Sequence, residues 1–204
     1  KVFIQYGMMS DEKFYDRAKS FSLLKNIDGK FFTFDEYKNN IEKTQIDKDG
    51  QLVYLYASDT DEQHSFINAA KERGYDILLL DGPIDNHFIN QLERKFEKSL
   101  FYRVDADIID KLIKKEDSLP SKLSEENQNK IKDLIEKQLE KEKYHISFES
   151  MSSKDAPFTI TLPEYPRRMK DMSAVGRGMD FMGGFPEQYT LVVNSNHPVL
   201  DKII

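Results

Sequence analysis

Tyr75-Asp-Ile-Leu-Leu-Leu80 is the stretch that decides the fold, because a nearly continuous apolar run of this length is typical of a strand buried on both faces. Two further apolar runs, Leu52–Tyr56 and Leu100–Val104, lie before and after it along the chain. The segments between the runs have helical patterns, with apolar positions at Phe66, Ala69 and Ala70 and then at Phe88, Leu92 and Phe96. This β-α-β-α-β order predicts parallel strands with right-handed crossovers, in a three-layer α/β/α sandwich over residues 50–105.

Residues 10–45 predict two helices that precede the sandwich. Ser10 is a suitable N-cap for the first helix, and Thr33 and Glu36 form a capping box for the second. One face of the first helix is expected to carry Phe14, Ala18, Phe21 and Leu24, and one face of the second to carry Phe34, Tyr37 and Ile41.

The sequence after the sandwich predicts a smaller unit. Residues 111–123 are charged, and we expect them to link a domain at 1–110 to a domain at 124–204. Ser124 caps a long predicted helix. Two strands joined by a polar turn are expected next, at His145–Glu149 and Phe158–Leu162. They are followed by a short helix at Tyr165–Met172, a Gly-rich loop at 176–186 and a last strand at Tyr189–Val193. The expected fold class is α/β plus α+β: a helical segment and a three-layer sandwich with parallel strands, then a small α+β C-terminal domain.

The composition is that of an ordinary globular protein. The 204 residues are 39% apolar and 32% charged, with a net charge of −6, and this mild acidity argues against nucleic acid as a partner. No apolar run approaches the ~18 residues of a membrane helix, so we expect no membrane partner. Because cysteine is absent, disulfides and thiol nucleophiles are excluded, and a cytoplasmic setting is favoured.

Both ends of the sequence interrupt a pattern. The sequence starts at Lys1–Gln5 without an initiator Met. At the other end, Asn196 as N-cap and Pro198 in the first turn predict the start of a helix, and its apolar pattern stops at Ile204. We therefore expect the chain to be a fragment of a longer protein.

Carboxylates follow two of the predicted strands. Asp59 and Asp61 come after the first strand and Asp81 after the second, at the edge where ligands of such sheets collect. One alternative is therefore a magnesium-dependent phosphotransfer enzyme that uses these three residues. Helix capping by Asp59 is the simpler interpretation. The four histidines are far apart along the chain and predict no metal site, and no other residue set predicts a catalytic centre.

A methionine-rich stripe is the strongest candidate for a binding surface. Tyr165, Met169 and Met172 lie at i, i+4 and i+7 of the predicted short helix, and so share one face. Burial of the stripe would make this segment a purely structural spacer. Charged residues surround it, however, and Met suits adaptable contacts with varied apolar partners. An exposed stripe would be a promiscuous protein-binding surface.

Taken together, these segments resemble the bacterial branch of the heat shock protein 90 chaperone family over almost the whole chain. The resemblance rests on pieces that occur in the family's order and spacing: Val2-Phe-Ile-Gln-Tyr-Gly7, Phe14-Tyr-Asp-Arg-Ala-Lys19, Phe32-Thr-Phe-Asp-Glu-Tyr37, Leu78-Leu-Leu-Asp-Gly-Pro-Ile-Asp85 and Leu191-Val-Val-Asn-Ser-Asn-His-Pro198. It implies that residues 1–110 are the later part of the family's middle domain and residues 124–204 the start of its C-terminal domain.

The resemblance implies a segment of an ATP-dependent chaperone that binds unfolded or partly folded client proteins. In this family the ATP site lies in an N-terminal domain. ATP and Mg²⁺ would therefore belong to the full-length protein, and the fragment would have no cofactor and no enzymatic activity. The family's dimerisation helices follow the turn that ends at Pro198. The full-length protein would thus be a cytoplasmic homodimer, and the fragment mainly monomeric.

The resemblance also implies two client-binding segments. Family members often carry an aromatic residue after the turn that ends at Asp85, where this chain has His87, Phe88 and Asn90. The family's amphipathic C-terminal helix matches the Tyr165, Met169 and Met172 stripe. The expected client-binding residues, with three from the following loop, are His87, Phe88, Asn90, Tyr165, Met169, Met172, Met179, Phe181 and Met182.

Overall fold

The central strand of the parallel sheet is buried along its whole length. In the computed structural model, which describes residues 1–115, 120–140, 142–175 and 188–203, β3 (Leu52–Ala57) lies between β4 (Ile77–Leu79) and β5 (Ser99–Arg103). It pairs in parallel with both neighbours, as predicted. Because successive side chains of a strand point to opposite faces, Leu52, Tyr54 and Tyr56 enter one apolar core and Val53, Leu55 and Ala57 enter another.

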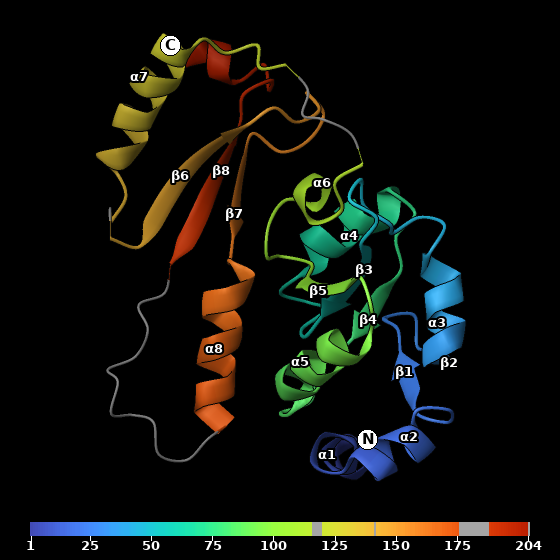
Figure 1. The fold of residues 1–204 in the computed structure, drawn as a ribbon. Helices are drawn as coiled ribbons and strands as arrows, with labels where there is room; N and C mark the ends of the chain where they lie inside the picture. The colour runs from blue at the N-terminus through green and yellow to red at the C-terminus, as the bar shows by residue number, and fades with distance from the viewer. Residues whose placement is uncertain (116–119, 141, 176–187, 204) are drawn as a thin grey trace.

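Helices cover both faces of this sheet, which confirms the three-layer α/β/α sandwich (Figure 1). α3 (Phe34–Ile41) and α5 (Asp85–Lys95) contribute to the core that contains Tyr54. α4 (His64–Glu72) and α6 (Ile109–Leu112) contribute to the core that contains Val53. The capping box that starts α3 is formed as expected, since the Glu36 amide donates to Thr33 Oγ1 and the Thr33 amide donates to Glu36 Oε2.

Two helices, α2 (Glu12–Ala18) and α3, lie within residues 10–45 as predicted, but the start and the length of the first were predicted wrongly. α1 (Val2–Ser10) precedes α2, and the N-cap of α2 is Asp11, whose carboxylate accepts from the Phe14 amide at 2.9 Å. Ser10 instead ends α1. Leu24 belongs to β1 (Leu23–Lys25), which forms an antiparallel hairpin with β2 (Phe31–Thr33).

The turn chemistry between β1 and β2 explains this error. The Asn26 side chain accepts from the amides of Asp28 and Lys30, and Gly29 has φ +81°, a conformation that glycine adopts without strain. Phe14 and Phe21, expected to share one helix face with Leu24, are exposed, whereas Leu24 is buried.

The end of the sandwich overlaps the segment expected to be a linker. Leu112 and Ile113 are buried in the core shared with α4, together with Ile109. The core of the α/β unit therefore reaches at least Ile113, and the two domain boundaries remain predictions.

The second half is an α+β unit, as expected. Its strands have the order β6-β8-β7, with β8 parallel to β6 and antiparallel to β7. The strands expected to form one hairpin, β6 and β7, are thus separated by β8. An apolar cluster that includes Ile131 and Val193 joins this sheet to α7 and to the last turn. The elements are α7 (Glu125–Glu136), β6 (Tyr144–Glu149), β7 (Phe158–Thr161), α8 (Glu164–Val175), β8 (Tyr189–Asn194) and the 3₁₀ helix η1 (Leu200–Lys202).

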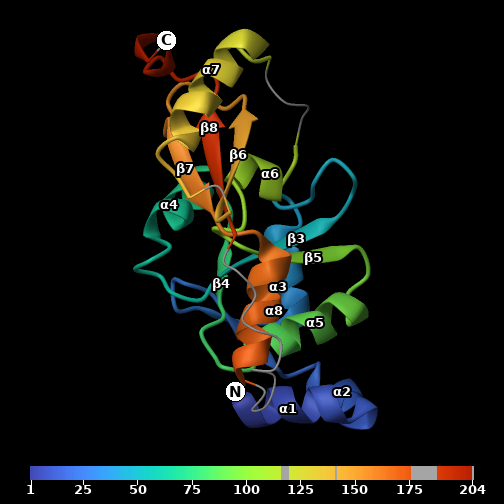
Figure 2. The same cartoon turned by 90° about the vertical axis from the view of Figure 1, so that its left-hand side faces the viewer.

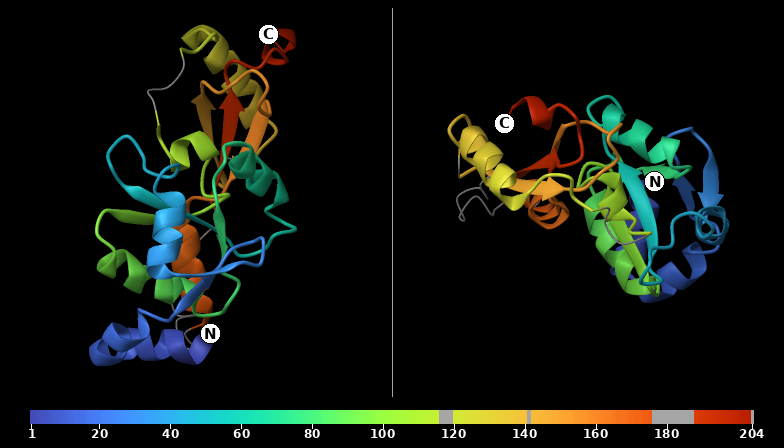
Figure 3. Two further views of the ribbon diagram at one scale, coloured as in Figure 1. Left: turned by 90° about the vertical axis from the view of Figure 1, so that its right-hand side faces the viewer. Right: turned by 90° about the horizontal axis from the view of Figure 1, so that it is seen from above.

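The two halves lie side by side, and α8 extends from the second half along the first (Figures 1 and 2). Seen from above, the sheet of the second half lies beside the α/β unit (Figure 3, right). α8 contacts α5 of the first half. The arrangement therefore brings together two segments that are about 80 residues apart in the sequence, as in the pairs Asn90 and Met172 or Arg168 and Asn90.

Candidate functional site

The methionine-rich stripe lies on α8, and the exposure of its side chains decreases from Tyr165 to Met172, which contacts α5. The Tyr165 side chain is 75% exposed and Met169 is 37% exposed, whereas Met172 is half-buried. Pro166 lies in the first helical turn, where a missing N–H costs little because first-turn amides lack an intrahelical partner. The structure therefore contradicts the alternative in which the whole stripe is buried in a spacer.

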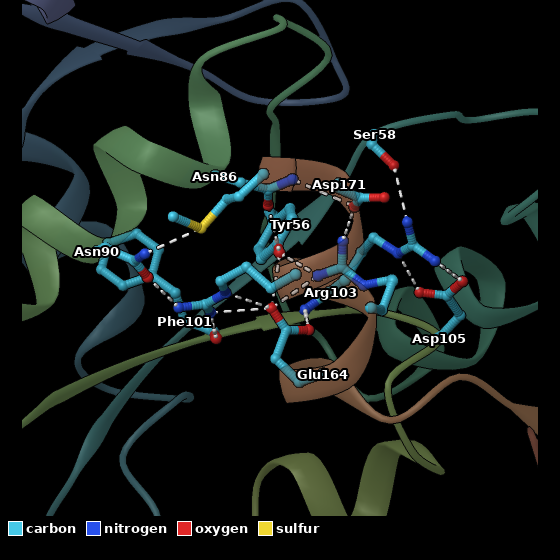
Figure 4. A network of polar contacts seen from close by, with 12 residues as sticks. Tyr56, Ser58, Asn86, Asn90, Phe101, Arg103, Asp105, Glu164 and Asp171 are labelled. Atoms are coloured by element: carbon cyan, nitrogen blue, oxygen red, sulfur yellow. Dashed lines mark hydrogen bonds and ion pairs between the residues drawn. The ribbon is translucent and has the colours of Figure 1, made fainter. Parts of the chain in front are cut away.

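The neighbouring face of α8 is charged and buried, which the sequence analysis did not predict. Arg167 and Arg168 are two of the charged residues that surround the stripe in the sequence, and they are only 5% and 9% exposed. They share the carboxylate of Glu164, one turn earlier on the same helix, at 2.7 Å and 2.8 Å. Pairs at i, i+3 and i, i+4 lie on one side of a helix, and here that side faces the α/β unit (Figure 4).

Glu164 lies at the ends of two parallel strands. Its Oε1 accepts from the Tyr56 hydroxyl of β3 at 2.7 Å, and its Oε2 accepts from the Arg103 amide at the end of β5 at 3.0 Å. The neighbouring Arg103 side chain is fixed by a two-point ion pair with Asp105 and donates to Ser58 (Figure 4). The carboxyl edge of a parallel sheet is where such folds usually bind ligands. In this chain a carboxylate from its own second half occupies that edge.

The ionisation of these groups follows from burial and charge. Burial alone would raise the pKa of Glu164, but the Arg167 and Arg168 guanidinium groups outweigh it and hold the pKa below its ordinary value. For the Tyr56 hydroxyl, burial and the Glu164 carboxylate raise the pKa well above the ordinary value. Glu164 is therefore a carboxylate and Tyr56 a neutral donor at physiological pH.

Arg168 makes the most extensive contacts with the first half. Its guanidinium donates to Glu93 at 2.8 Å, to the Asn90 side-chain oxygen at 2.9 Å and to the Phe101 carbonyl at 2.9 Å. Arg167 donates to Asp171 at 2.6 Å and to the Tyr56 hydroxyl at 2.6 Å. The Arg167 Nε is buried and has no partner.

The two predicted client-binding segments meet at one place. The side-chain amide of Asn90 donates to the Met172 sulfur at 3.2 Å. The side-chain amide of Asn86, one turn earlier on α5, donates to the Asp171 carboxylate at 3.2 Å. A cavity of about 340 Å³ lies between α8, α5 and β5, and its lining includes Asn90, Tyr102, Tyr165, Met169 and Met172. The stripe and the Asn90 segment thus form one surface.

Not all predicted residues lie on this surface. Phe88 is 3% exposed and packs in the core, with its ring 6.5 Å from that of Phe34, so it is not available for contact with another protein. His87 is half-buried and does not line the cavity. Met179, Phe181 and Met182 lie outside the described residues.

Two of the three carboxylates of the enzyme alternative, Asp59 and Asp81, have separate structural partners. Asp59 accepts from the amides of Asp61 and Glu62, both at 2.9 Å, and so holds the turn that precedes α4; it is not the helix cap that the sequence predicted, because α4 begins at His64 with Gln63 as its N-cap. Asp81 forms an ion pair with Lys1 at 3.3 Å. Over the described ranges, no group of three or more His, Asp or Glu side chains is arranged to hold a metal ion. Nor does any helix in that part of the chain have the length and apolar character needed to cross a membrane.

A second exposed apolar surface lies on α1 and the β1–β2 hairpin. Phe3 is 92% exposed, and Leu23 and Phe31 are more than half exposed. A cavity of about 430 Å³ lies beside them, between α1, the hairpin and β4. The sequence analysis did not identify this surface, because it predicted neither α1 nor the hairpin.

A comparison with family models places the whole chain in one family. The model described as "Hsp90 protein" matches residues 2–204, so the chain belongs to the Hsp90 family. Within the family it is similar to bacterial proteins named chaperone protein HtpG. It is 44% identical over 207 residues to those of Porphyromonas gingivalis and Bacteroides thetaiotaomicron, and 42% identical to that of Bacteroides fragilis.

These alignments cover all of this chain and 30% of each relative, so the chain spans less than a third of the length of the proteins it matches. A solved structure of a heat shock protein middle domain from Plasmodium falciparum covers 52% of this chain and 44% of its own, with a TM-score of 0.41 and 19% identity. That likeness is too distant to carry a structural argument.

Proposed function

We propose that this chain is a non-catalytic segment of an ATP-dependent, cytoplasmic chaperone and binds unfolded or partly folded client proteins. The observation that carries the proposal is the partly exposed stripe of Tyr165, Met169 and Met172 beside the cavity against α5. Flexible thioether side chains adapt to apolar partners of different shape, which a chaperone surface requires. The similarity to HtpG chaperones supports the same function.

Under this proposal ATP and Mg²⁺ act elsewhere in the longer protein, and so do the contacts that form a homodimer. The separate structural roles of Asp59 and Asp81 favour this arrangement over the phosphotransfer alternative. The fragment itself is expected to be mainly monomeric and to hydrolyse no ATP above background.

A permanently unfolded polypeptide, fluorescently labelled reduced and carboxymethylated α-lactalbumin, provides the test. The Met169→Ser plus Met172→Ser variant is expected to bind it about five-fold or more weakly by fluorescence anisotropy, because it removes apolar contact area. Phe3→Ser is the matched control, since it removes an exposed apolar side chain on the other surface. Equal weakening by both variants, or weakening by Phe3→Ser alone, would contradict the assignment to α8.

A further inference from the structure

The described halves of the chain are joined mainly by polar contacts. Each of the three apolar clusters in the described residues belongs to one half, two of them to residues 8–113 and the third to residues 123–200. Contacts between the halves include the Arg168–Glu93 ion pair, the Glu164–Tyr56 hydrogen bond and the Lys111–Glu149 ion pair. Units joined by polar interfaces usually move relative to each other, whereas large apolar interfaces hold units together.

One face of α8 carries the interface, and a different face carries the stripe. Glu164, Arg167 and Arg168 face the α/β unit and are buried or nearly so. Met172 lies closest to this face and is half-buried, while Tyr165 is largely exposed. Consequently the polar contacts fix the rotation of α8 about its axis, and this rotation determines which stripe residues face solvent.

We propose that Glu164, Arg167 and Arg168 form a charge latch that positions the client-binding stripe, by holding α8 at the carboxyl edge of the parallel sheet and against α5. The inference rests on the proposed client-binding function and adds positioning residues to it. Arg168 is the central member, because it reaches Glu93 and Asn90 on α5 and the Phe101 carbonyl on β5. Opening of the latch would separate Met172 from Asn90 and divide the surface in two.

Methyl NMR of the 204-residue chain labelled at methionine can report the latch directly. Met172 contacts Asn90 across the interface, whereas Met8 is buried within the first half and serves as an internal reference. Arg168→Gln removes the charge and leaves Glu93 without this ion pair. We expect the Met172 methyl resonance to shift while that of Met8 stays in place, and affinity for labelled carboxymethylated α-lactalbumin to fall roughly 2- to 30-fold.

Three further variants separate positioning from other effects. Arg168→Lys retains the charge and is expected to recover part of both signals. Glu93→Gln removes the same ion pair from the opposite half, so it should repeat the effect even if Arg168→Gln fails to fold. Arg94 is exposed on α5, and Arg94→Gln makes the same change in net charge as Arg168→Gln, so it should change neither signal.

The outcomes for the latch and for client binding can be told apart. If the wild-type chain does not bind the polypeptide but Arg168→Gln and Glu93→Gln still shift the Met172 resonance, the proposed function fails and the positioning of α8 stands. If the wild-type chain binds and both variants leave Met172 and the affinity unchanged, the latch is overturned. A shifted Met172 with unchanged affinity would also overturn it, because the position of α8 would then not matter for binding.

Discussion

The side-chain amide of Asn90 on α5 donates a hydrogen bond to the thioether of Met172 on α8, with 3.2 Å between Nδ2 and Sδ. Both residues are expected client-binding residues, but they belong to segments 82 positions apart and to different halves of the chain. Their contact joins two predicted segments into one surface. The shape of that surface therefore depends on how the halves are held together.

Met169→Ser is expected to leave folding nearly unchanged and to weaken client binding. The side chain is 37% exposed, and substitutions at such positions usually change the free energy of unfolding by no more than about 0.5 kcal/mol. Thermal melts and anisotropy titrations measure the two effects. Met8→Ala is the contrasting variant, since truncation of a methionine in the core typically costs about 2–5 kcal/mol. A large fall in melting temperature for Met169→Ser would mean that the stripe belongs to a core.

Tyr56→Phe is expected to destabilise the chain by about 1–3 kcal/mol, because it removes a buried, hydrogen-bonded hydroxyl. That hydroxyl donates to Glu164 and accepts from Arg167, so the variant leaves both charged groups with one contact fewer. Urea unfolding measures the cost. Tyr165→Phe changes the same group on an exposed ring and should be nearly neutral. Equal stability of the two variants would show that the hydroxyl of Tyr56 contributes little.

Glu164 is expected to make stability depend on pH in the acidic range. Because its folded-state pKa lies below the ordinary value of 4.5, the unfolded chain binds more protons there and stability rises with pH. The contribution is fully present above about pH 5 and is lost as the pH falls through the lowered folded-state pKa. The groups that face Glu164 are Tyr56, Arg167, Arg168 and the Arg103 amide.

Urea titrations of the wild-type chain and of Glu164→Gln between pH 3 and 7 would measure this dependence. The difference in unfolding free energy between the two proteins should be constant at neutral pH and should narrow below about pH 4.5. A difference that widens at low pH would contradict the sign of the pKa shift.

Asp59→Ala is expected to cost about 0.5–1.5 kcal/mol of stability, the usual net contribution of an intramolecular hydrogen bond, because its carboxylate holds the turn that precedes α4. Its carboxylate accepts from two backbone amides that would lose their partner. A magnesium titration followed by amide NMR should leave Asp59 and Asp61 unshifted in the wild-type chain. Saturable shifts of both amides at micromolar magnesium would instead revive the phosphotransfer alternative.

The sequence predicted those features whose signals are local. Apolar runs located the strands of the parallel sheet, Thr33 and Glu36 identified the start of α3, and the spacing of Tyr165, Met169 and Met172 identified one face of α8. Errors arose where two local signals competed. The Asn26 turn with Gly29 formed a hairpin in place of a continued helix, and Asp11 rather than Ser10 began α2.

Only the tertiary structure decided which face of α8 is buried and what it packs against. Glu164, Arg167 and Arg168 have the spacing of helical ion pairs, which are usually solvated and contribute little, so periodicity gave no reason to expect their burial. Their partners Tyr56 and Glu93 are 75 or more positions away in the sequence. A helical period specifies which residues share a face but not what that face meets. By itself, therefore, the sequence determined the parallel sheet, most helices and the spacing of the stripe. The packing of the two halves decided that the charged face of α8 is buried and that the stripe lies beside Asn90.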